Sequence, residues 1–330
     1  MDVLEVRDLC VDYLCEDGTA LHAVEDFGFH LEQGRSLGLV GESGCGKTTA
    51  MLAMLRLLPA EGRIMTGQVL YQGVDLFSLS EGEMRTYRWN KLSLVFQGAM
   101  NALNPVRRVG DQIAEAIKHH RAAPDAKAVK DRVVELLELV GITPEMARQY
   151  PHQYSGGMRQ RAMIAMALAC SPDVLVADEP TTALDVMVQA QILDLLQNLQ
   201  QELGLSVILV THDLGVVAEI CDDVLVMYAG KVVEYGSVDV IFNEPQHPYT
   251  QRLLQAFPDI EDPQMTLTSI PGYPPPLDAM PPGCRFEPRC LCPTSICPEK
   301  SPKLVRIEPG HFVACNRLKG TPYGTEAGFE

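Results

Sequence analysis

The sequence predicts an α/β fold with a mostly parallel sheet, and two observations indicate it. Short apolar runs, such as residues 36–40 and 207–210, alternate with longer segments of helical periodicity. This alternation is typical of buried parallel strands that are covered by helices on both faces. The second observation is a glycine-rich turn at residues 41–46, between the first apolar run and the helix expected after it. The 330 residues suffice for one large domain and an appendage.

The elements can be placed in order from turn residues and periodicity. Residues 3–13 and 21–31 are expected to form an antiparallel pair of strands, joined by a turn at 16–18. This pair predicts an N-terminal antiparallel β subdomain. The core strands are expected at 36–40, 92–96, 174–177, 207–210 and 224–228, and the core helices at 47–58, 186–203 and 214–221.

Two segments depart from this alternation. Residues 101–170 are helical in pattern, with breaks at prolines, and predict an inserted helical subdomain. After about residue 245 proline becomes frequent, and five of the ten cysteines lie between residues 284 and 315. We therefore expect one domain at residues 1–245 and an irregular, Cys/Pro-rich C-terminal extension at residues 246–330.

The composition is that of a globular chain, with 46% hydrophobic and 21% charged residues. The net charge of −16 argues against nucleic acid as a partner and against direct docking on anionic lipid. No apolar run approaches the roughly 20 residues that span a bilayer, and the N-terminus lacks a secretory signal pattern. The expected location is the cytosol, where thiols stay reduced. At a membrane, this chain would bind another protein.

A phosphate-binding loop is the strongest local signal. Residues 41–49 match the P-loop pattern, between a predicted strand and a predicted helix, which indicates a P-loop NTPase core. In such a loop, backbone N–H groups and the positive end of the helix dipole bind phosphate oxygens. Lys47 would contact the β- and γ-phosphates, and the Thr48 hydroxyl would bind Mg²⁺. The expected nucleotide-binding residues are Gly41, Glu42, Ser43, Gly44, Cys45, Gly46, Lys47, Thr48 and Thr49.

Two carboxylates follow another buried run. Asp178 and Glu179 come directly after the apolar residues 174–177. Taken alone, such a pair is often a strand end that meets solvent. In a chain that also has a P-loop, it indicates a Mg-nucleotide site, where Asp178 would hold Mg²⁺ and Glu179 would polarise the attacking water.

A further motif narrows the class of NTPase. Residues 154–161 read Tyr-Ser-Gly-Gly-Met-Arg-Gln-Arg, which resembles the LSGGQ signature of ABC-family ATPases. Other markers of that family occur in its usual order, namely Gln97, the Ala-Leu-Asp of 183–185 and the Thr-His-Asp of 211–213. The resemblance implies that residues 1–245 are an ABC nucleotide-binding domain that binds and hydrolyses ATP.

The signature departs from the family pattern at two positions. Its Leu is replaced by Tyr154 and its Gln by Met158, whereas Ser155, Gly156 and Gly157 are intact. The three intact residues are those that contact nucleotide in the family. Because the P-loop already surrounds its own nucleotide, the resemblance implies that the signature serves ATP bound to a partner chain in a head-to-tail dimer.

The resemblance also implies roles for four other residues. Gln97 would join the Mg²⁺ shell and sense the membrane subunit, and His212 would contact the γ-phosphate. Asp185 would belong to the D-loop of the family. Tyr13 matches an early aromatic position whose ring stacks on adenine, although an aromatic residue in a β-hairpin more often serves packing.

Several segments resemble one branch of the family, the dipeptide and oligopeptide importers. They are residues 96–105, 150–153, 247–250 and the cysteine-containing tail. This resemblance implies two integral-membrane permease subunits, an extracytoplasmic substrate-binding protein and a place on the cytoplasmic face of the cell membrane. It also favours a second, related ATPase as partner, although a homodimer is chemically feasible because both half-sites are complete in this chain.

Other functions remain open from the sequence. The same branch also serves nickel, glutathione and some oligosaccharides. ABC ATPases of DNA repair carry long coiled-coil insertions, and those of translation are commonly tandem. This chain has one P-loop and no long heptad region. A regulatory, metal-sensing ATPase without a transport role is the weaker remaining alternative.

The clustered cysteines of the extension predict a metal site. In a cytosolic chain they point to metal rather than to disulfides. Zinc is an alternative, but its structural sites typically pair cysteines two to four residues apart. Within the importer branch, the same pattern is associated with a [4Fe–4S] cluster. Cys292, an extra thiol beside Cys290, could replace it as a ligand. A set of reduced, partly buried thiols without metal is the alternative. The four expected ligands are Cys284, Cys290, Cys297 and Cys315.

Overall fold

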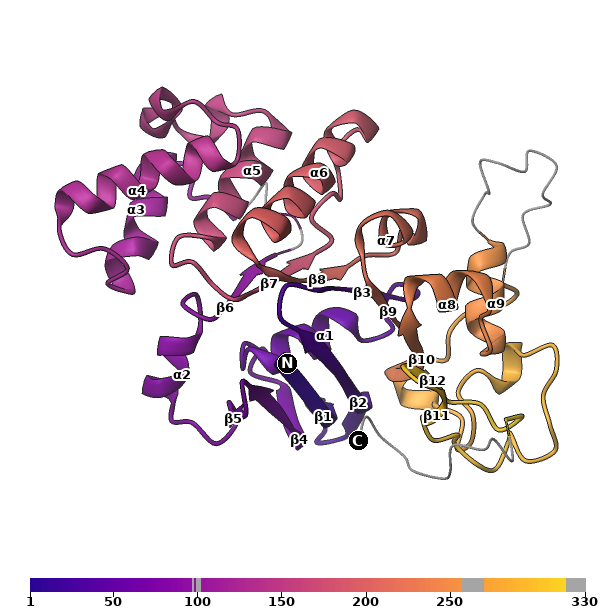
Figure 1. Cartoon of the computed structure of the whole chain (residues 1–330). Helices are drawn as coiled ribbons and strands as arrows, with labels where there is room; N and C mark the ends of the chain where they lie inside the picture. The colour runs from indigo at the N-terminus through magenta and orange to yellow at the C-terminus, as the bar shows by residue number, and fades with distance from the viewer. Residues whose placement is uncertain (97, 99–101, 257–269, 319–330) are drawn as a thin grey trace. The chain divides into compact units, whose positions relative to one another are not determined.

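The computed structural model describes residues 1–96, 98, 102–256 and 270–318 (Figure 1). The chain forms two compact units, each built from separate stretches of sequence. The helical unit comprises residues 1, 32–35 and 78–209, and the P-loop unit comprises residues 2–31, 36–77 and the chain from 210 onward.

The helical unit contains short buried strands and most of the long helices. Its strands are β6 (Leu92–Val95), β7 (Val174–Asp178) and β8 (Ser206–Val210), and its helices are α2 (Glu81–Tyr87), α3 (Val109–His119), α4 (Ala126–Leu139), α5 (Gly156–Ala167) and α6 (Val186–Leu203). β6 pairs with β7 in parallel. The helices α3, α4 and α5 gather into the predicted helical subdomain (Figure 1).

The P-loop unit contains two groups of strands. In the first, β2 (Ala20–Glu32), β1 (Asp2–Leu14), β4 (Gly62–Tyr71) and β5 (Val74–Asp75) lie in this order, and β1 pairs with β4 antiparallel. The predicted N-terminal β subdomain is therefore confirmed. In the second group, β3 (Ser36–Val40) pairs with β9 (Asp223–Tyr228) in parallel. The helices are α1 (Lys47–Met54), α7 (Leu214–Ile220), α8 (Val238–Asn243) and α9 (Pro248–Gln255).

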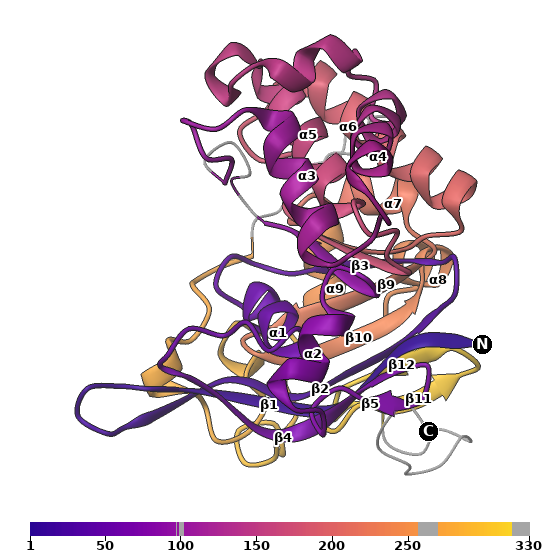
Figure 2. The ribbon, with the colours of Figure 1, turned by 90° about the vertical axis from the view of Figure 1, so that its left-hand side faces the viewer.

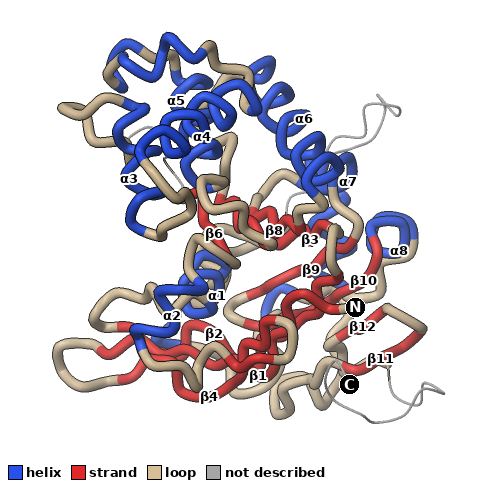
Figure 3. The backbone as a smooth tube through the Cα atoms, turned by 60° about the vertical axis from the view of Figure 1, so that its left-hand side comes forward, coloured by secondary structure: helices blue, strands red, loops and turns tan. Residues whose placement is uncertain are grey.

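The C-terminal extension adds strands to this second group. β10 (Lys231–Ser237) pairs antiparallel with β9 on one side and with β12 (His311–Val313) on the other, and β11 (Val305–Glu308) pairs with β12 (Figure 2). Most of the described extension is loop (Figure 3), as predicted. Its division from residues 1–245 as a separate domain stays a prediction, since both segments contribute to the P-loop unit.

The aromatic core of the P-loop unit includes a residue of the extension. Phe286 is 2% exposed, and its ring packs edge-on against Tyr228 of β9 and Tyr249 of α9, with centroids 5.1 and 5.4 Å away. Val226 and Leu214 belong to the same cluster. The extension is therefore fixed to the sheet by buried apolar contacts.

Some predicted elements differ from the structure. The helix expected at 47–58 ends at Met54, because Arg56 takes a left-handed φ of 53° before Pro59 is reached. Pro144 and Pro151 do not simply break helices. Each begins a short 3₁₀ helix, where its fixed φ suits the first turn. The strands β4 and β5 and the helix α2 were not predicted. None of the described helices has the length and apolar character needed to cross a membrane.

Candidate functional site

The P-loop follows β3 and continues into α1, as predicted. Its first glycine is required by close packing, since a Cβ on Gly41 would lie 2.2 Å from the carbonyl oxygen of Met227 in β9. Gly46, with φ of 102°, precedes the first helical residue and accepts the N–H of Ala50 at 2.9 Å. The loop therefore packs closely against the sheet and ends at the N-terminus of α1. This arrangement is suited to anion binding.

Lys47 carries the positive charge of this loop. It is 6% exposed, and its Nζ donates to the carbonyl oxygens of Gly41 at 2.6 Å and Glu42 at 3.1 Å. Burial raises the pKa of the neighbouring Cys45 thiol. Cys45 therefore stays neutral and adds no negative charge to the loop.

Tyr13 lies next to the loop. It is half-buried near the end of β1, and its hydroxyl is 3.3 Å from the hydroxyl of Thr49 in the first turn of α1. Thr48, Ser43 and Gly44 are exposed. The structure therefore brings Tyr13 to the P-loop, which sequence distance alone could not establish.

Two residues that sequence reasoning did not assign to the site contact Glu42. The Tyr249 hydroxyl accepts the backbone N–H of Glu42 at 3.0 Å, and Arg289 donates to both carboxylate oxygens of Glu42 at 3.0 and 3.1 Å. Tyr249 lies in the segment 247–250, which was noted for its family resemblance, and Arg289 lies in the cysteine-containing tail.

In the helical unit, the two predicted carboxylates occupy the end of β7. Asp178 is its last residue and is 4% exposed. Glu179 takes a left-handed φ of 45°, and its carboxylate accepts a hydrogen bond of 2.9 Å from the Thr182 hydroxyl. Asp185 then caps α6 by accepting the N–H of Val188 at 3.0 Å. A buried strand end thus carries both groups, as predicted.

The signature motif forms the N-terminus of α5. Ser155 is exposed and accepts the N–H of Met158 at 3.2 Å. A Cβ on Gly157 would lie 2.6 Å from a methyl group of Val188, so this position allows α5 to approach α6. Gly156 is half-buried beside it. A helix N-terminus of this kind is suited to bind an anion.

The packing of Tyr154 accounts for one departure from the signature pattern. This residue is 3% exposed, and its hydroxyl donates to the carbonyl oxygen of Met146 at 2.8 Å. Burial raises the pKa of Tyr154 to about 12. Tyr154 is therefore a core side chain whose buried hydroxyl has a hydrogen-bond partner.

The remaining predicted residues are placed as follows. His212 is exposed after β8, and Asp213 caps α7 by accepting the N–H groups of Gly215 and Val216. Gln97 lies outside the described residues. The P-loop unit holds Tyr13, residues 41–49 and His212, whereas the helical unit holds Asp178, Glu179, Asp185 and residues 155–157.

The cysteines of the extension surround one small pocket. The backbone N–H of Cys284 donates to the carbonyl oxygen of Cys297 at 2.8 Å. The sulfurs of Cys290 and Cys292 are 3.9 Å apart. Burial raises the pKa of Cys290 to about 11, and burial and neighbouring thiols raise that of Cys315. The lining includes Cys284, Cys290, Cys292, Cys297, Cys315, His247 and Arg317.

This donor set fits a thiolate-bound metal group. Burial and neighbouring thiols disfavour the ionisation of several of these cysteines, and a bound cation would stabilise their thiolate forms. Among the described residues, no three of these sulfurs lie within 4.8 Å of one another.

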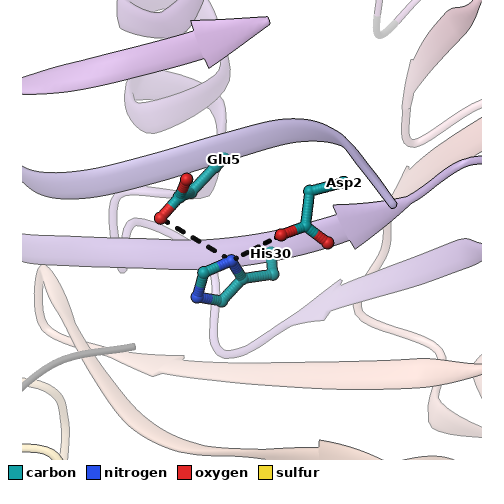
Figure 4. Close-up of side chains that lie close together, drawn as sticks. All are labelled: Asp2, Glu5 and His30. Atoms are coloured by element: carbon teal, nitrogen blue, oxygen red, sulfur yellow. Dashed lines mark ion pairs between the residues drawn. The ribbon is translucent and has the colours of Figure 1, made fainter. Parts of the chain in front are cut away.

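Asp2, Glu5 and His30 form another close group in the described part of the chain (Figure 4). The Nδ1 of His30 is 3.3 Å from Asp2 and 3.7 Å from Glu5, and Arg7 pairs with Glu5 at 2.5 Å. Because the Arg7 guanidinium already binds Glu5, we interpret this group as a surface ion-pair network.

Known proteins resemble the chain in both of its predicted segments. Residues 24–182 match the ABC transporter family, and residues 233–297 match the oligopeptide/dipeptide transporter C-terminal region. The probable peptide ABC transporter ATP-binding protein y4tR of Sinorhizobium fredii is 48% identical over 319 residues, which cover 96% of this chain and 95% of that protein. The oligopeptide transport ATP-binding protein OppD of Bacillus subtilis is 46% identical, with 94% and 87% covered.

Solved structures show the same fold. The dimeric ABC transporter cassette MJ0796, bound to ADP and Pi, superposes with a TM-score of 0.63 at 27% identity and covers 71% of this chain and 98% of its own. CbiO1 of Clostridium perfringens, part of the ABC transporter complex cbiONQ, gives a TM-score of 0.62 at 28% identity, with 74% and 91% covered. The chain therefore belongs to the ATP-hydrolysing subunits of ABC transporters, in the branch that carries the oligopeptide/dipeptide transporter C-terminal region.

Proposed function

We propose that this chain hydrolyses ATP to drive the import of dipeptides or oligopeptides. The observation that carries the proposal is the similarity to peptide-transport ATP-binding proteins along 96% of the chain, the C-terminal region included. Relatives named for oligopeptide and dipeptide transport are similarly close, at 46% identity each. Nickel, glutathione and oligosaccharides are the alternative cargoes.

In this proposal the P-loop binds ATP, and the two carboxylates at the end of β7 take part in its hydrolysis. Residues 41–49 would hold the phosphates, and Thr48, Gln97 and Asp178 would hold Mg²⁺, whose charge would offset that of the phosphates. Glu179 accepts a proton from the attacking water, and His212 contacts the γ-phosphate. The adenine ring stacks on Tyr13. The residues that serve the partner's nucleotide are Ser155, Gly156 and Gly157, with Asp185 at the contact between the two chains.

The substrate can be tested by peptide stimulation of ATP hydrolysis. The chain would be purified with its membrane partners, and the extracytoplasmic binding protein would be added with peptides, nickel, glutathione or oligosaccharides. We expect peptides to raise the rate of ATP hydrolysis and the other solutes to leave it unchanged. The matched control is the same complex with Lys47→Ala, in which no solute should stimulate. Stimulation by nickel alone would contradict the peptide assignment.

We further propose that the chain works at the cytoplasmic face of the membrane in a complex with two permeases and a second, different ATPase. Both half-sites are present in this chain, so the preference for a heterodimer rests on family resemblance. Intact-mass measurement of the purified complex is expected to show one copy of this chain and one of the second ATPase. Two copies of this chain with no second ATPase would refute the heterodimer.

The cysteine pocket is proposed to hold a [4Fe–4S] cluster, whose binding energy would stabilise a loop-rich segment. We expect protein purified without oxygen to be brown and to contain iron and sulfide. Cys297→Ser should lose both and lower the resistance of the extension to proteolysis. Cys15→Ser, which changes an exposed cysteine outside the extension, is the control.

Zinc is the competing metal. A colourless wild-type protein that contains stoichiometric zinc would overturn the cluster and leave the ATPase assignment unaffected. Separate Cys290→Ser and Cys292→Ser variants identify the ligand, because the serine that replaces a ligand should reduce the iron content and the other should not.

A further inference from the structure

Two side chains of the C-terminal extension hold the second residue of the P-loop. Arg289 donates from one nitrogen to both carboxylate oxygens of Glu42, at 3.0 and 3.1 Å. The Tyr249 hydroxyl accepts the backbone N–H of the same residue at 3.0 Å. Glu42 is thereby fixed at its main chain and at its side chain by residues that follow it by 207 and 247 positions.

These two partners are themselves rigidly placed. The Arg289 side chain is 6% exposed. It also donates to the Tyr228 hydroxyl at 3.2 Å and to the Pro271 carbonyl at 2.9 Å, and its guanidinium lies 5.7 Å from the centre of the Tyr228 ring. Tyr249 is completely buried, 4.7 Å from Tyr228 between ring centres. Since neither side chain can move freely, their contacts fix Glu42 in one position.

Glu42 needs such a partner because of its charge. Its carboxylate is part of a loop that binds a polyphosphate, and like charges in a partly buried site repel. Arg289 compensates this charge. Glu42 also presents its carbonyl oxygen to Lys47 Nζ at 3.1 Å, so the orientation of the Glu42 peptide influences where the phosphate-binding ammonium lies.

We propose that Arg289 is a positioning residue for the nucleotide site, which couples the cysteine-rich extension to ATP binding through Glu42. The proposal rests on the phosphate-binding role proposed for residues 41–49. Arg289 directly precedes Cys290, so the segment that carries the cysteines also carries the group that balances the P-loop carboxylate. Disruption of this segment would release Arg289 and weaken ATP binding.

The test is a double-mutant cycle with nucleotides of different charge. Affinities for a non-hydrolysable ATP analogue, ADP and AMP are measured by calorimetry on the full chain. Arg289→Met leaves the Glu42 carboxylate uncompensated, and we expect about tenfold weaker binding of the ATP analogue, with smaller losses for ADP and AMP. Arg289→Lys keeps the charge and should retain most of the affinity. Adding Glu42→Gln to Arg289→Met should restore most of the loss.

The matched control is Arg285→Met. Arg285 is also a buried arginine of the extension, but it binds the carbonyl of Ala229 and the carboxylate of Glu25, which keeps Lys231 as a second partner at 2.8 Å. Its loss should not produce a defect that grows with nucleotide charge. Equal losses for the ATP analogue and AMP in Arg289→Met, or no recovery on adding Glu42→Gln, would overturn the positioning role.

Lys47→Ala separates this proposal from the one on which it rests. If Lys47→Ala binds the ATP analogue as the wild type does, the P-loop is not the nucleotide site and both ideas fail. If Lys47→Ala loses binding while Arg289→Met keeps wild-type affinity, only the role of Arg289 is wrong.

Coupling is reciprocal, so nucleotide should also affect the extension. We expect the ATP analogue to slow amide hydrogen exchange around residues 284–290 in the wild type, and to do so much less in Arg289→Met. Exchange in this segment that does not respond to nucleotide in the wild type would contradict the coupling.

Discussion

Glu179→Gln is expected to bind ATP with near wild-type affinity and to lose about a thousandfold in turnover. The amide has the shape of the carboxylate but cannot accept a proton from water. Glu179 adopts a left-handed φ of 45° and accepts a hydrogen bond from Thr182. A glutamine oxygen can keep that hydrogen bond, so the local turn should be preserved. The loss would therefore report chemistry rather than misfolding.

Two other variants distinguish loss of the carboxylate from loss of its orientation and from loss of ATP binding. Thr182→Val removes the hydroxyl that orients Glu179 and should slow turnover much less, because the carboxylate remains. Lys47→Ala should instead weaken ATP binding itself. Single-turnover hydrolysis and ATP binding, both measured in the assembled transporter, separate the two effects. Wild-type turnover in Glu179→Gln would mean that another group activates the water.

The central elements could be predicted because local signals mark their ends. The helix expected at 186–203 has these bounds in the structure, since Asp185 caps its first turn and Gly204 ends it with a left-handed φ of 62°. The strand expected at 36–40 is uninterrupted and fully buried. Such segments are long or strongly apolar, and their boundaries depend on residues within a few positions.

Other elements depend on contacts with distant sequence. β11 and β12 have four and three residues, too few for a periodic pattern, and β12 forms because the edge of β10 is available for pairing. Phe286 lies in a segment that reads as loop, yet it enters the aromatic core of the P-loop unit. No local pattern predicts that placement.

The candidate site also combines residues that local motifs predict with residues that depend on distant contacts. The P-loop and the Asp178-Glu179 pair were predicted because phosphate and Mg²⁺ binding require those residue types at fixed spacing, and the signature was predicted from its family resemblance. The motifs did not identify Arg289 and Tyr249 as partners of Glu42. Those contacts depend on the fold of the extension against the P-loop, which only the structure shows.

Glu234 links the C-terminal extension to the sheet through hydrogen bonds. Its side chain on β10 is fully buried, with 0% exposure. Its carboxylate accepts the backbone N–H groups of Gln246 at 2.7 Å and His247 at 3.0 Å, and it pairs with the ring Nε2 of His311 at 2.9 Å. Burial lowers the pKa of His247 to about 4, so its neutral ring accepts the N–H of Tyr249 at 3.0 Å. One carboxylate thus joins β10, the start of α9 and β12.

Glu234→Leu is expected to destabilise this junction by about 3–5 kcal/mol. The substitution leaves two backbone N–H groups and the buried His311 ring without their acceptor. Glu234→Gln keeps the shape and one acceptor oxygen, and should cost less. Glu115→Gln is the control, since Glu115 is 59% exposed in its pair with Arg107 and such surface pairs contribute about 0–1 kcal/mol.

The effect should be local and can be measured as such. Native-state hydrogen exchange reports the opening free energy of β12 and α9 separately from that of β7 in the helical unit. In Glu234→Leu we expect β12 and α9 to lose protection while β7 keeps it, because Gln246, His247 and His311, the three hydrogen-bond partners of the carboxylate among the described residues, all belong to the P-loop unit. Unchanged protection of β12 would show that the buried aromatic contacts of Phe286 suffice to hold the extension, and that Glu234 adds little to them.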